Sequence, residues 1–168
     1  MKRDESKNLE LYSPEVFQLL MDYEISRSQR YPAPLTLLNM TVVPGEQNPV
    51  IQQAMDAVVP SIINSHLRAA DIPSKKNDQY LILLPLTNES GGRAVCERLL
   101  SLFKGLIHTE TGLTFSVAVY IGLSSHHGGA NLSGEVLIQQ AAAALKHARS
   151  QGIPTYSVYS DIQKSTHP

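Results

Sequence analysis

The sequence predicts a single α/β domain in which helices cover a sheet. Two observations support this prediction. Helix-type and strand-type hydrophobic patterns alternate along the chain, and the apolar run from Tyr80 to Leu84 is continuous, as in a central strand covered on both faces. The length of 168 residues suits one domain with one core. We expect this domain at residues 12–160, between a flexible N-terminal tail at 1–11 and a polar C-terminal tail at 161–168.

The composition is that of a soluble globular protein, with 42% hydrophobic residues, 17% charged residues and a net charge of −1. Such a near-neutral chain has no broad field to attract nucleic acid or an anionic membrane, so neither is expected as a partner. Its single cysteine, Cys96, excludes an intrachain disulfide. The charged N-terminus lacks the apolar region of a signal peptide, and no run is long enough to span a membrane. These features predict a cytoplasmic protein.

The first third of the chain predicts a helix, a strand and a second helical region. Ser13 is a good N-cap for a helix that ends at Tyr31-Pro32. The β-rich apolar run at 34–43 then predicts a core strand. Residues 47–67 have helical spacing, and Pro60 within them marks a kink or a boundary. One or two helices therefore fill this span.

Five polar residues at 74–78 precede the strand that ends at Pro85. Such a run predicts a tight turn at a sheet edge, because Asn77 and Asp78 can hydrogen-bond their own backbone and tolerate positive φ. We therefore expect a hairpin whose tip lies in solvent.

The middle of the chain predicts a third helix from Asn88 to about Phe103 and a long strand at 114–124. After this strand, the Ser, His and Gly residues at 124–129 predict a flexible loop.

An alanine-rich helix at 132–150 follows, and Gly152 lies where a C-cap glycine belongs. A short strand at 155–159 then leads into the polar tail.

Several of these segments together resemble the GGDEF family, the diguanylate cyclases. The chain opens like that family, with Phe17, Leu20, Glu24, Arg27, Arg30, Tyr31 and Pro34-Leu35 in matching places. It closes like the family, with Leu137, Ala141, Ala144-Leu145, Ala148-Arg149 and Gly152. Before the hairpin it keeps the family's R-x-x-D as Arg68 and Asp71. The resemblance implies a nucleotidyl-cyclase-like sandwich: a central mixed, mostly antiparallel sheet flanked by helices, with the hairpin projecting from it.

The G-G-[DE]-E-F signature itself is altered. Counting back from Pro85, its five places are taken by Lys76, Asn77, Asp78, Gln79 and Tyr80. The family's two glycines let phosphate approach the hairpin backbone, whereas Lys76 and Asn77 carry side chains that restrict this approach. Gln79 is neutral where the family has a glutamate, and Asp78 is either a turn residue or a single metal ligand.

The resemblance implies two-metal phosphoryl transfer between two GTP molecules, which requires carboxylates to hold magnesium. The family's metal-binding aspartate late in the first strand corresponds to Thr41, and the acid two residues on corresponds to Val43. Arg149 replaces the phosphate-facing lysine, and Ile153 falls at the place of an arginine. Because the residues that the family uses are replaced at all of these positions, we expect no catalytic residue, no metal site, no cofactor and no cyclase activity.

In the family, R-x-x-D belongs to a product-inhibition site that binds cyclic di-GMP. An arginine such as Arg68 can bind phosphate or the O6/N7 edge of guanine, and a carboxylate such as Asp71 can accept from N1–H and N2–H. Arg98 falls near the place of a further arginine of this site. The alternative interpretation is that Arg68 and Asp71 form an ion pair at a helix end.

Three other features predict structure, not function. His126 and His127 lie in a Gly/Ser loop without a matched third ligand, which favours a solvated loop over a metal site. Cys96 lies on an apolar helix face without a paired histidine and reads as a small core residue. Lys75 and Lys76 read as part of a solvated turn.

Three functions are consistent with the sequence. The first is a catalytically inactive GGDEF-like bacterial signalling domain that acts through protein contacts, with a partner protein or as a homodimer. The second is a cyclic di-GMP receptor that uses Arg68, Asp71 and Arg98. The third is residual GTP binding or cyclase activity that uses Asp78 and Arg149. The first predicts no nucleotide binding, the second predicts binding that is lost in Arg68→Ala, and the third predicts magnesium-dependent GTP binding that is lost in Asp78→Ala.

Overall fold

The computed structural model describes residues 11–166, so most of the predicted N-terminal tail and the last two residues of the C-terminal tail lie outside the described residues. The elements in chain order are α1 (Pro14–Arg30), β1 (Leu35–Pro44), α2 (Pro49–Ser65), β2 (Ile72–Lys76), β3 (Gln79–Pro85), α3 (Glu89–Leu102), β4 (Leu106–His108), β5 (Thr114–His126), α4 (Gly134–Ser150), β6 (Thr155–Val158) and α5 (Tyr159–Ser165). Within residues 11–166, no helix combines the length and the apolar character that a membrane span requires.

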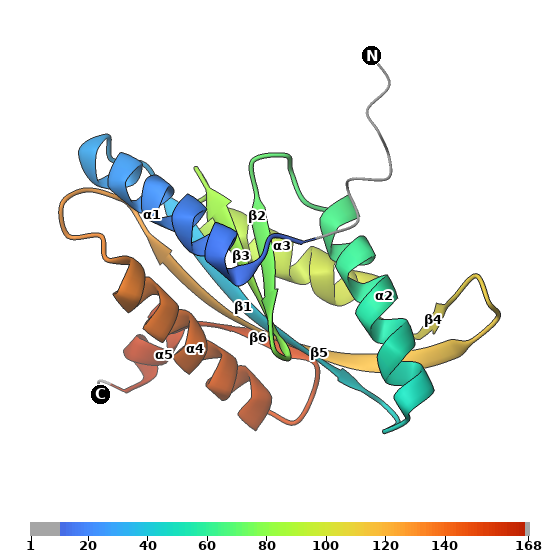
Figure 1. Cartoon of the computed structure of the whole chain (residues 1–168). Coiled ribbons are helices and arrows are strands. Elements are labelled where there is room, and N and C mark those ends of the chain that lie inside the picture. Colours follow the sequence, from blue (N-terminus) through green and yellow to red (C-terminus); the bar gives the residue numbers. More distant parts are fainter. Residues whose placement is uncertain (1–10, 167–168) are drawn as a thin grey trace, which may run out of the picture.

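One sheet of six strands forms the centre of the molecule (Figure 1). Its order is β2-β3-β1-β5-β4, and β6 also pairs with β5. Among the strand pairs of residues 11–166, β5–β6 is parallel and the others are antiparallel. Strand β1 lies between β3 and β5, so that Leu35 has Pro85 on one side and His126 on the other. This confirms the predicted mixed, mostly antiparallel sheet.

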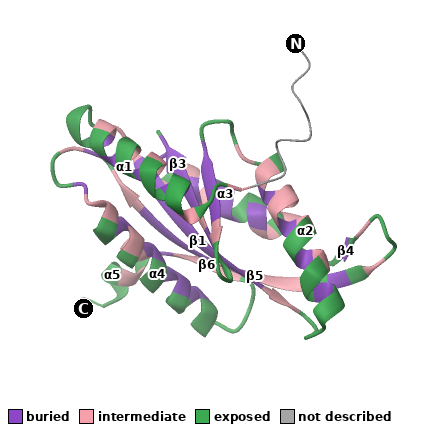
Figure 2. Cartoon of the chain, in the orientation of Figure 1, coloured by how far each residue is buried: buried purple, intermediate pink, exposed green. Residues whose placement is uncertain are grey.

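Helices cover both faces of this sheet, and the core therefore has two halves. Helices α2 and α3 pack on the face that includes Leu38 and Met40, whereas α1 and α4 pack on the face that includes Leu37. Successive residues of a strand point to opposite faces, which explains why β1 is apolar along most of its length. Figure 2 shows the resulting pattern, with buried strands between helices that are exposed on their outer sides.

The helix N-termini form as their sequences predict. Ser13 Oγ accepts the backbone N–H of Val16 at the start of α1, and Asn88 Oδ1 accepts that of Gly91 at the start of α3. Helix α1 ends at Arg30 with Tyr31 as its C-cap, which confirms the predicted boundary. Gly152 has a φ of 73° after α4, the left-handed conformation expected of a glycine there.

Residues Pro49–Ser65 form one helix that continues through Pro60. The sequence left open one helix or two, and packing decides between them. The buried residues of α2 are Ile51, Met55, Val59 and Ile63. They recur at four-residue spacing on both sides of Pro60, so one continuous apolar face lies against the sheet.

The structure corrects the predicted bounds of two loops. The hairpin turn contains only Asn77 and Asp78, because Ser74 to Lys76 pair with β3 as part of β2. Asn77 has a φ of 55°, as a two-residue hairpin turn requires. The residues 124–126 belong to β5, where they pair with β1, so the loop after that strand is shorter than predicted.

Two short elements were not predicted. Strand β4 has three residues, too few to show an alternating pattern. Helix α5 begins at Tyr159, the last residue of the predicted strand, and continues into the expected polar C-terminal tail, where Asp161 forms an ion pair with Arg93 of α3 at 2.9 Å. Part of this tail is therefore helical and packs on the domain.

Candidate functional site

A recess of about 340 Å³ lies at the end of β1. Four parts of the fold line it: the last residues of β1, the helix α2, the β2–β3 hairpin and the end of α4. The recess brings together Thr41, Val43, Asp78 and Arg149, which lie far apart in the sequence. These are four of the places that the family resemblance singles out for phosphoryl transfer. Ile153 is not among the residues that line the recess.

Strand β1 contributes Thr41 and Val43 to the recess. Thr41 lies beside Gln79 of β3, so the two places at which the family carries acids are cross-strand neighbours here. Thr41 is buried, and its Oγ1 has no hydrogen-bond partner among the described residues. The β1 side of the recess therefore consists of neutral side chains, among them the buried Thr41 and the half-buried Val43.

Two carboxylates line the recess, Asp56 on α2 and Asp78 at the hairpin tip. Asp56 Oδ1 accepts from Lys75 Nζ at 2.9 Å and from Gln52 Nε2 at 3.1 Å. Asp78 is exposed and forms no ion pair within residues 11–166. Of the two carboxylates, Asp56 is therefore already matched to a cation from its own chain.

Lys75 lies over the ring of Tyr80, with its Nζ 5.6 Å from the ring centroid. Burial lowers the pKa of Lys75, but the hydrogen bond to Asp56 and the charges of Tyr80 and Asp56 together raise it more, so the net pKa lies above its ordinary value. The pKa of Tyr80 is also above its ordinary value, because burial disfavours the charged phenolate form. Lys75 therefore stays charged inside the recess, which corrects its interpretation as part of a solvated turn.

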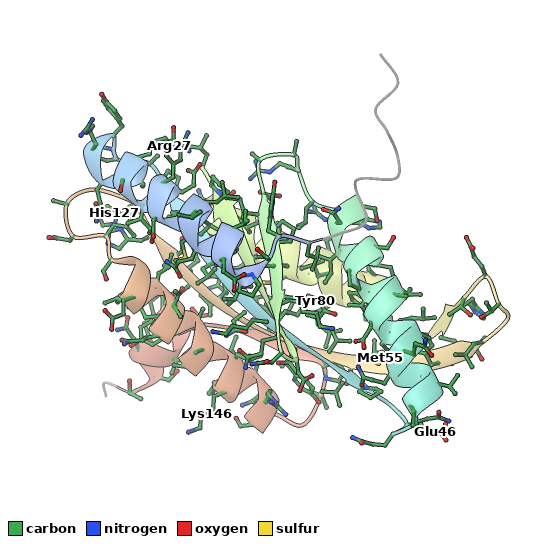
Figure 3. The ribbon with its side chains drawn as sticks, viewed as in Figure 1. Arg27, Glu46, Met55, Tyr80, His127 and Lys146 are labelled. Atoms are coloured by element: carbon green, nitrogen blue, oxygen red, sulfur yellow. The ribbon has the colours of Figure 1, made fainter. Side chains whose placement is uncertain are left out.

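The five signature residues divide between the tip and the base of the hairpin. The tip contains Lys76, Asn77, Asp78 and Gln79, which are all exposed. Tyr80 is buried and packs in the core half under α2, and Figure 3 labels it together with Met55 of α2. Tyr80 therefore anchors the hairpin, while the four residues at its tip face solvent.

Arg68 and Asp71 contact each other at the end of α2. The backbone N–H of Arg68 donates to Asp71 Oδ2 at 2.9 Å, and Arg68 Nη2 lies 3.4 Å from Asp71 Oδ1. Arg68 Nη2 also donates to Thr87 Oγ1 at 2.6 Å. The side chain of Asp71 is only 1% exposed, whereas that of Arg68 is 61% exposed. This is the geometry of the alternative interpretation, a helix-end ion pair.

Arg98 of α3 reaches the same end of α2, where its Nη2 donates to the carbonyl of His66 at 3.0 Å. The structure therefore brings Arg68 and Arg98 to one end of a helix, whose carbonyl groups attract cations. Asp71 is turned inward beside them. Binding of cyclic di-GMP by these three residues stays a prediction.

The two adjacent histidines stack on each other, with ring centroids 4.6 Å apart and an interplanar angle of 16°. His126 Nδ1 accepts the backbone N–H of Gly128 at 2.9 Å. Burial, and then the charge of His127, lower the pKa of His126, which favours the neutral ring. Within the described chain, no group of three or more His, Cys, Asp or Glu side chains is placed to hold a metal ion.

Sequence reasoning did not identify Gln52 and Asp56 as part of the recess. They lie four residues apart on the exposed side of α2, which a helical pattern describes only as polar. Only the packing of α2 beside the hairpin brings them to the site.

No protein-family model matches the chain, and no curated protein matches it significantly by sequence. Solved structures do match it. The GGDEF domain of YfiN (TpbB) from Pseudomonas aeruginosa is 15% identical with a TM-score of 0.72, over 94% of this chain and 98% of that one. The diguanylate cyclase SiaD from the same organism, solved in complex with its activator SiaC, is 20% identical with a TM-score of 0.74, over 90% of this chain and 60% of that one.

The GGDEF domain of DgcB from Caulobacter crescentus, solved in complex with c-di-GMP, is 13% identical with a TM-score of 0.71. That match covers 95% of this chain and 96% of the DgcB chain. Likeness at such low identity establishes the fold and not the activity. The chain has the fold of a GGDEF domain.

Proposed function

We propose that this chain is a GGDEF-like bacterial signalling domain that does not synthesise cyclic di-GMP and acts through protein contacts. One observation carries the proposal. The recess at the end of β1 has Thr41 and Val43 on its β1 side, and one of its two carboxylates, Asp56, is bound to Lys75. Among the described residues, the place where a cyclase would hold two magnesium ions thus offers a single unpaired carboxylate, that of Asp78.

The residues of the recess do not fit a two-magnesium site. Magnesium requires several oxygen ligands in octahedral geometry, and two such ions side by side require carboxylates to offset their charge. Asp78 alone is free to supply one, while Lys75 and Arg149 add positive charge to the same recess. Loss of charge stabilisation at several points multiplies, because each ~1.4 kcal/mol changes the rate tenfold.

Protein contacts are one role that a GGDEF fold can serve without catalysis. Among the matched structures, SiaD is solved together with a protein activator, SiaC. By analogy, we propose a protein partner or a second copy as the ligand of this domain.

Isothermal titration with GTP and magnesium tests the proposal, with the Asp78→Ala variant alongside. We expect that neither the unaltered chain nor the variant shows a saturable heat of GTP binding. Saturable, magnesium-dependent binding that is lost in Asp78→Ala would overturn the proposal and support the residual GTP-binding function that uses Asp78 and Arg149.

A second candidate function is a cyclic di-GMP receptor. The position of Arg68 just after α2, and the hydrogen bond from Arg98 to the His66 carbonyl at the end of that helix, favour it. Two exposed guanidinium groups can bind the phosphates of a cyclic dinucleotide even though Asp71 is turned inward. The matched DgcB domain was solved in complex with c-di-GMP.

Titration with cyclic di-GMP separates the two candidates. A receptor binds it saturably and loses binding in Arg68→Ala and in Arg98→Ala, but keeps binding in the control Arg149→Ala, which changes the recess instead. No binding by the unaltered chain would exclude the receptor function.

A further inference from the structure

Helix α1 carries a row of apolar side chains on its outer face. Val16, Leu19 and Tyr23 are 41%, 70% and 65% exposed, respectively. Their spacing of three and four residues places them in one line, opposite the buried Phe17 and Met21. Tyr12, just before the helix, is exposed as well. Single exposed apolar residues are ordinary, but a continuous row of them marks an interaction surface.

The C-terminal half of the same helix borders a recess instead of carrying a row of apolar side chains. Tyr23, Ser26, Arg27, Arg30 and Tyr31 line a recess of about 270 Å³. The outer face of α1 therefore has projecting apolar side chains in its first half and a recess in its second half. Figures 1 and 3 show this helix at the outside of the domain, with Arg27 labelled in Figure 3.

Charge is divided along α1 in the same way. Glu15 lies in the first turn and Arg30 in the last turn, and both are exposed. Neither forms an ion pair with another residue of the described chain, whereas Arg27 pairs with Glu24 at 2.7 Å. The face is acidic at its N-terminal end and basic at its C-terminal end.

We propose that α1 packs antiparallel against α1 of a second copy of this chain, about a two-fold axis near the middle of the helix. A two-fold interface uses the same patch on both partners, so the patch must be complementary to itself. The axis places Leu19 of each copy beside Tyr23 of the other, and the side chains before Leu19 against the recess of the other copy. It also directs Glu15 of each copy toward the end where Arg30 of the other lies.

A parallel arrangement of the two helices is disfavoured by the same features. It would set Glu15 beside Glu15 and Arg30 beside Arg30. The apolar row of one copy would then lie against the apolar row of the other, and the two recesses would face each other. The antiparallel arrangement also opposes the two helix dipoles, which is the favourable orientation. Residues 1–10, MKRDESKNLE, contain too few apolar side chains to cover the row in place of a second copy.

This inference deepens the proposed function, because it names the partner and the surface of the protein contact. The dimer inference and the proposed loss of cyclase activity can fail separately. Self-association is measured without nucleotide, and nucleotide binding is measured on the recess at the end of β1, which shares no residue with α1.

Analytical ultracentrifugation over a range of protein concentrations tests the inference. We expect a reversible monomer–dimer equilibrium whose dissociation constant rises at least about tenfold in Leu19→Asp. The matched control is Ile153→Asp, which places the same charge at another exposed apolar residue and should leave the equilibrium unchanged. A chain that stays monomeric at every concentration, or a dimer that Leu19→Asp does not weaken, would overturn the inference.

Charge reversal tests the antiparallel direction. Glu15→Arg and Arg30→Glu should each weaken the dimer, and the double variant should restore it, because each reversed charge then meets its opposite on the other copy. A double variant that is weaker than both single variants would overturn the antiparallel arrangement.

Discussion

The carboxylate of Asp71 holds the backbone of Arg68, with 2.9 Å between the Arg68 nitrogen and Asp71 Oδ2. The guanidinium of Arg68 in turn bonds Thr87 Oγ1, so one short network links the end of α2 with the start of β2 and the loop after β3. Asp71 is buried and Arg68 largely exposed. The R-x-x-D motif therefore has a structural role in this chain, whatever ligand its arginine binds.

This network predicts unequal effects of its two members on stability. Asp71→Ala should lower the free energy of unfolding by about 2–3 kcal/mol, because it removes the charged acceptor of the partly buried backbone N–H group of Arg68. Arg68→Ala should cost no more than about 1 kcal/mol, because most of its side chain is in solvent. Urea denaturation of both variants measures the difference, and equal losses would contradict this account of the motif.

Gly122 of β5 is predicted to tolerate no side chain. A Cβ atom there would lie 2.2 Å from the Ala141 oxygen and 2.2 Å from the Leu145 nitrogen, both backbone atoms of α4. Because backbone cannot swing aside, Gly122→Ala should cost about 3 kcal/mol or more. The control is Gly112→Ala, where φ is +84° but nothing lies within 4 Å. It should cost only the backbone strain of about 1–2 kcal/mol, and thermal unfolding of the two variants compares them.

The attachment of α5 should weaken in acid. Burial raises the pKa of Glu89, but its hydrogen bonds with Arg93 and Ser160 lower it more, so the net pKa lies below its ordinary value. A carboxyl group whose pKa is depressed on folding stabilises the fold above its unfolded pKa, and this stability is lost as the pH falls through the folded value.

Arg93 joins Glu89 of α3 to Asp161 of α5, at 2.9 Å from each. Hydrogen exchange of the α5 amides should therefore accelerate as the pH falls below about 4, relative to the intrinsic rate. In Arg93→Ala it should already be fast at neutral pH. If the α5 amides of the unaltered chain were equally protected from hydrogen exchange at neutral pH and below about pH 4, that would argue against this attachment.

Cys96 is predicted to be inert in the folded protein. The side chain is fully buried, and burial, with a smaller effect of Glu97, raises the pKa of the thiol well above its usual range. Its reaction with a thiol reagent should be at least about a hundredfold slower in buffer than in concentrated urea. Rapid labelling of the native chain would show that α3 opens readily.

Long, strongly patterned elements could be predicted from the sequence because burial on both sheet faces imposes apolar runs. The strand that follows the hairpin turn, β3, and the helix that begins after Ser13 are examples, and both are confirmed. The short strand β4 and the helix α5 escaped prediction. Helix α5 has no buried residue, and polar contacts of Asp161 with Arg93 and of Ser160 with Glu89 link it to α3.

The site was predictable only in part, for a related reason. Positions matched along the chain, such as Thr41 and Asp78, do meet in one recess. Asp56 and the pairing that occupies Lys75 could not be predicted, because they depend on how α2 packs beside the hairpin. A helical pattern determines which side of α2 is polar but not what that side faces.

The most direct test of the central claim is a turnover assay. The purified chain is incubated with GTP and magnesium for hours, and the products are separated by chromatography, with an active diguanylate cyclase as the positive control. We predict no cyclic di-GMP above the level of a protein-free blank. Cyclic di-GMP formed by the unaltered chain and absent with Asp78→Ala would contradict the account, because it would show that the recess at the end of β1 still performs phosphoryl transfer.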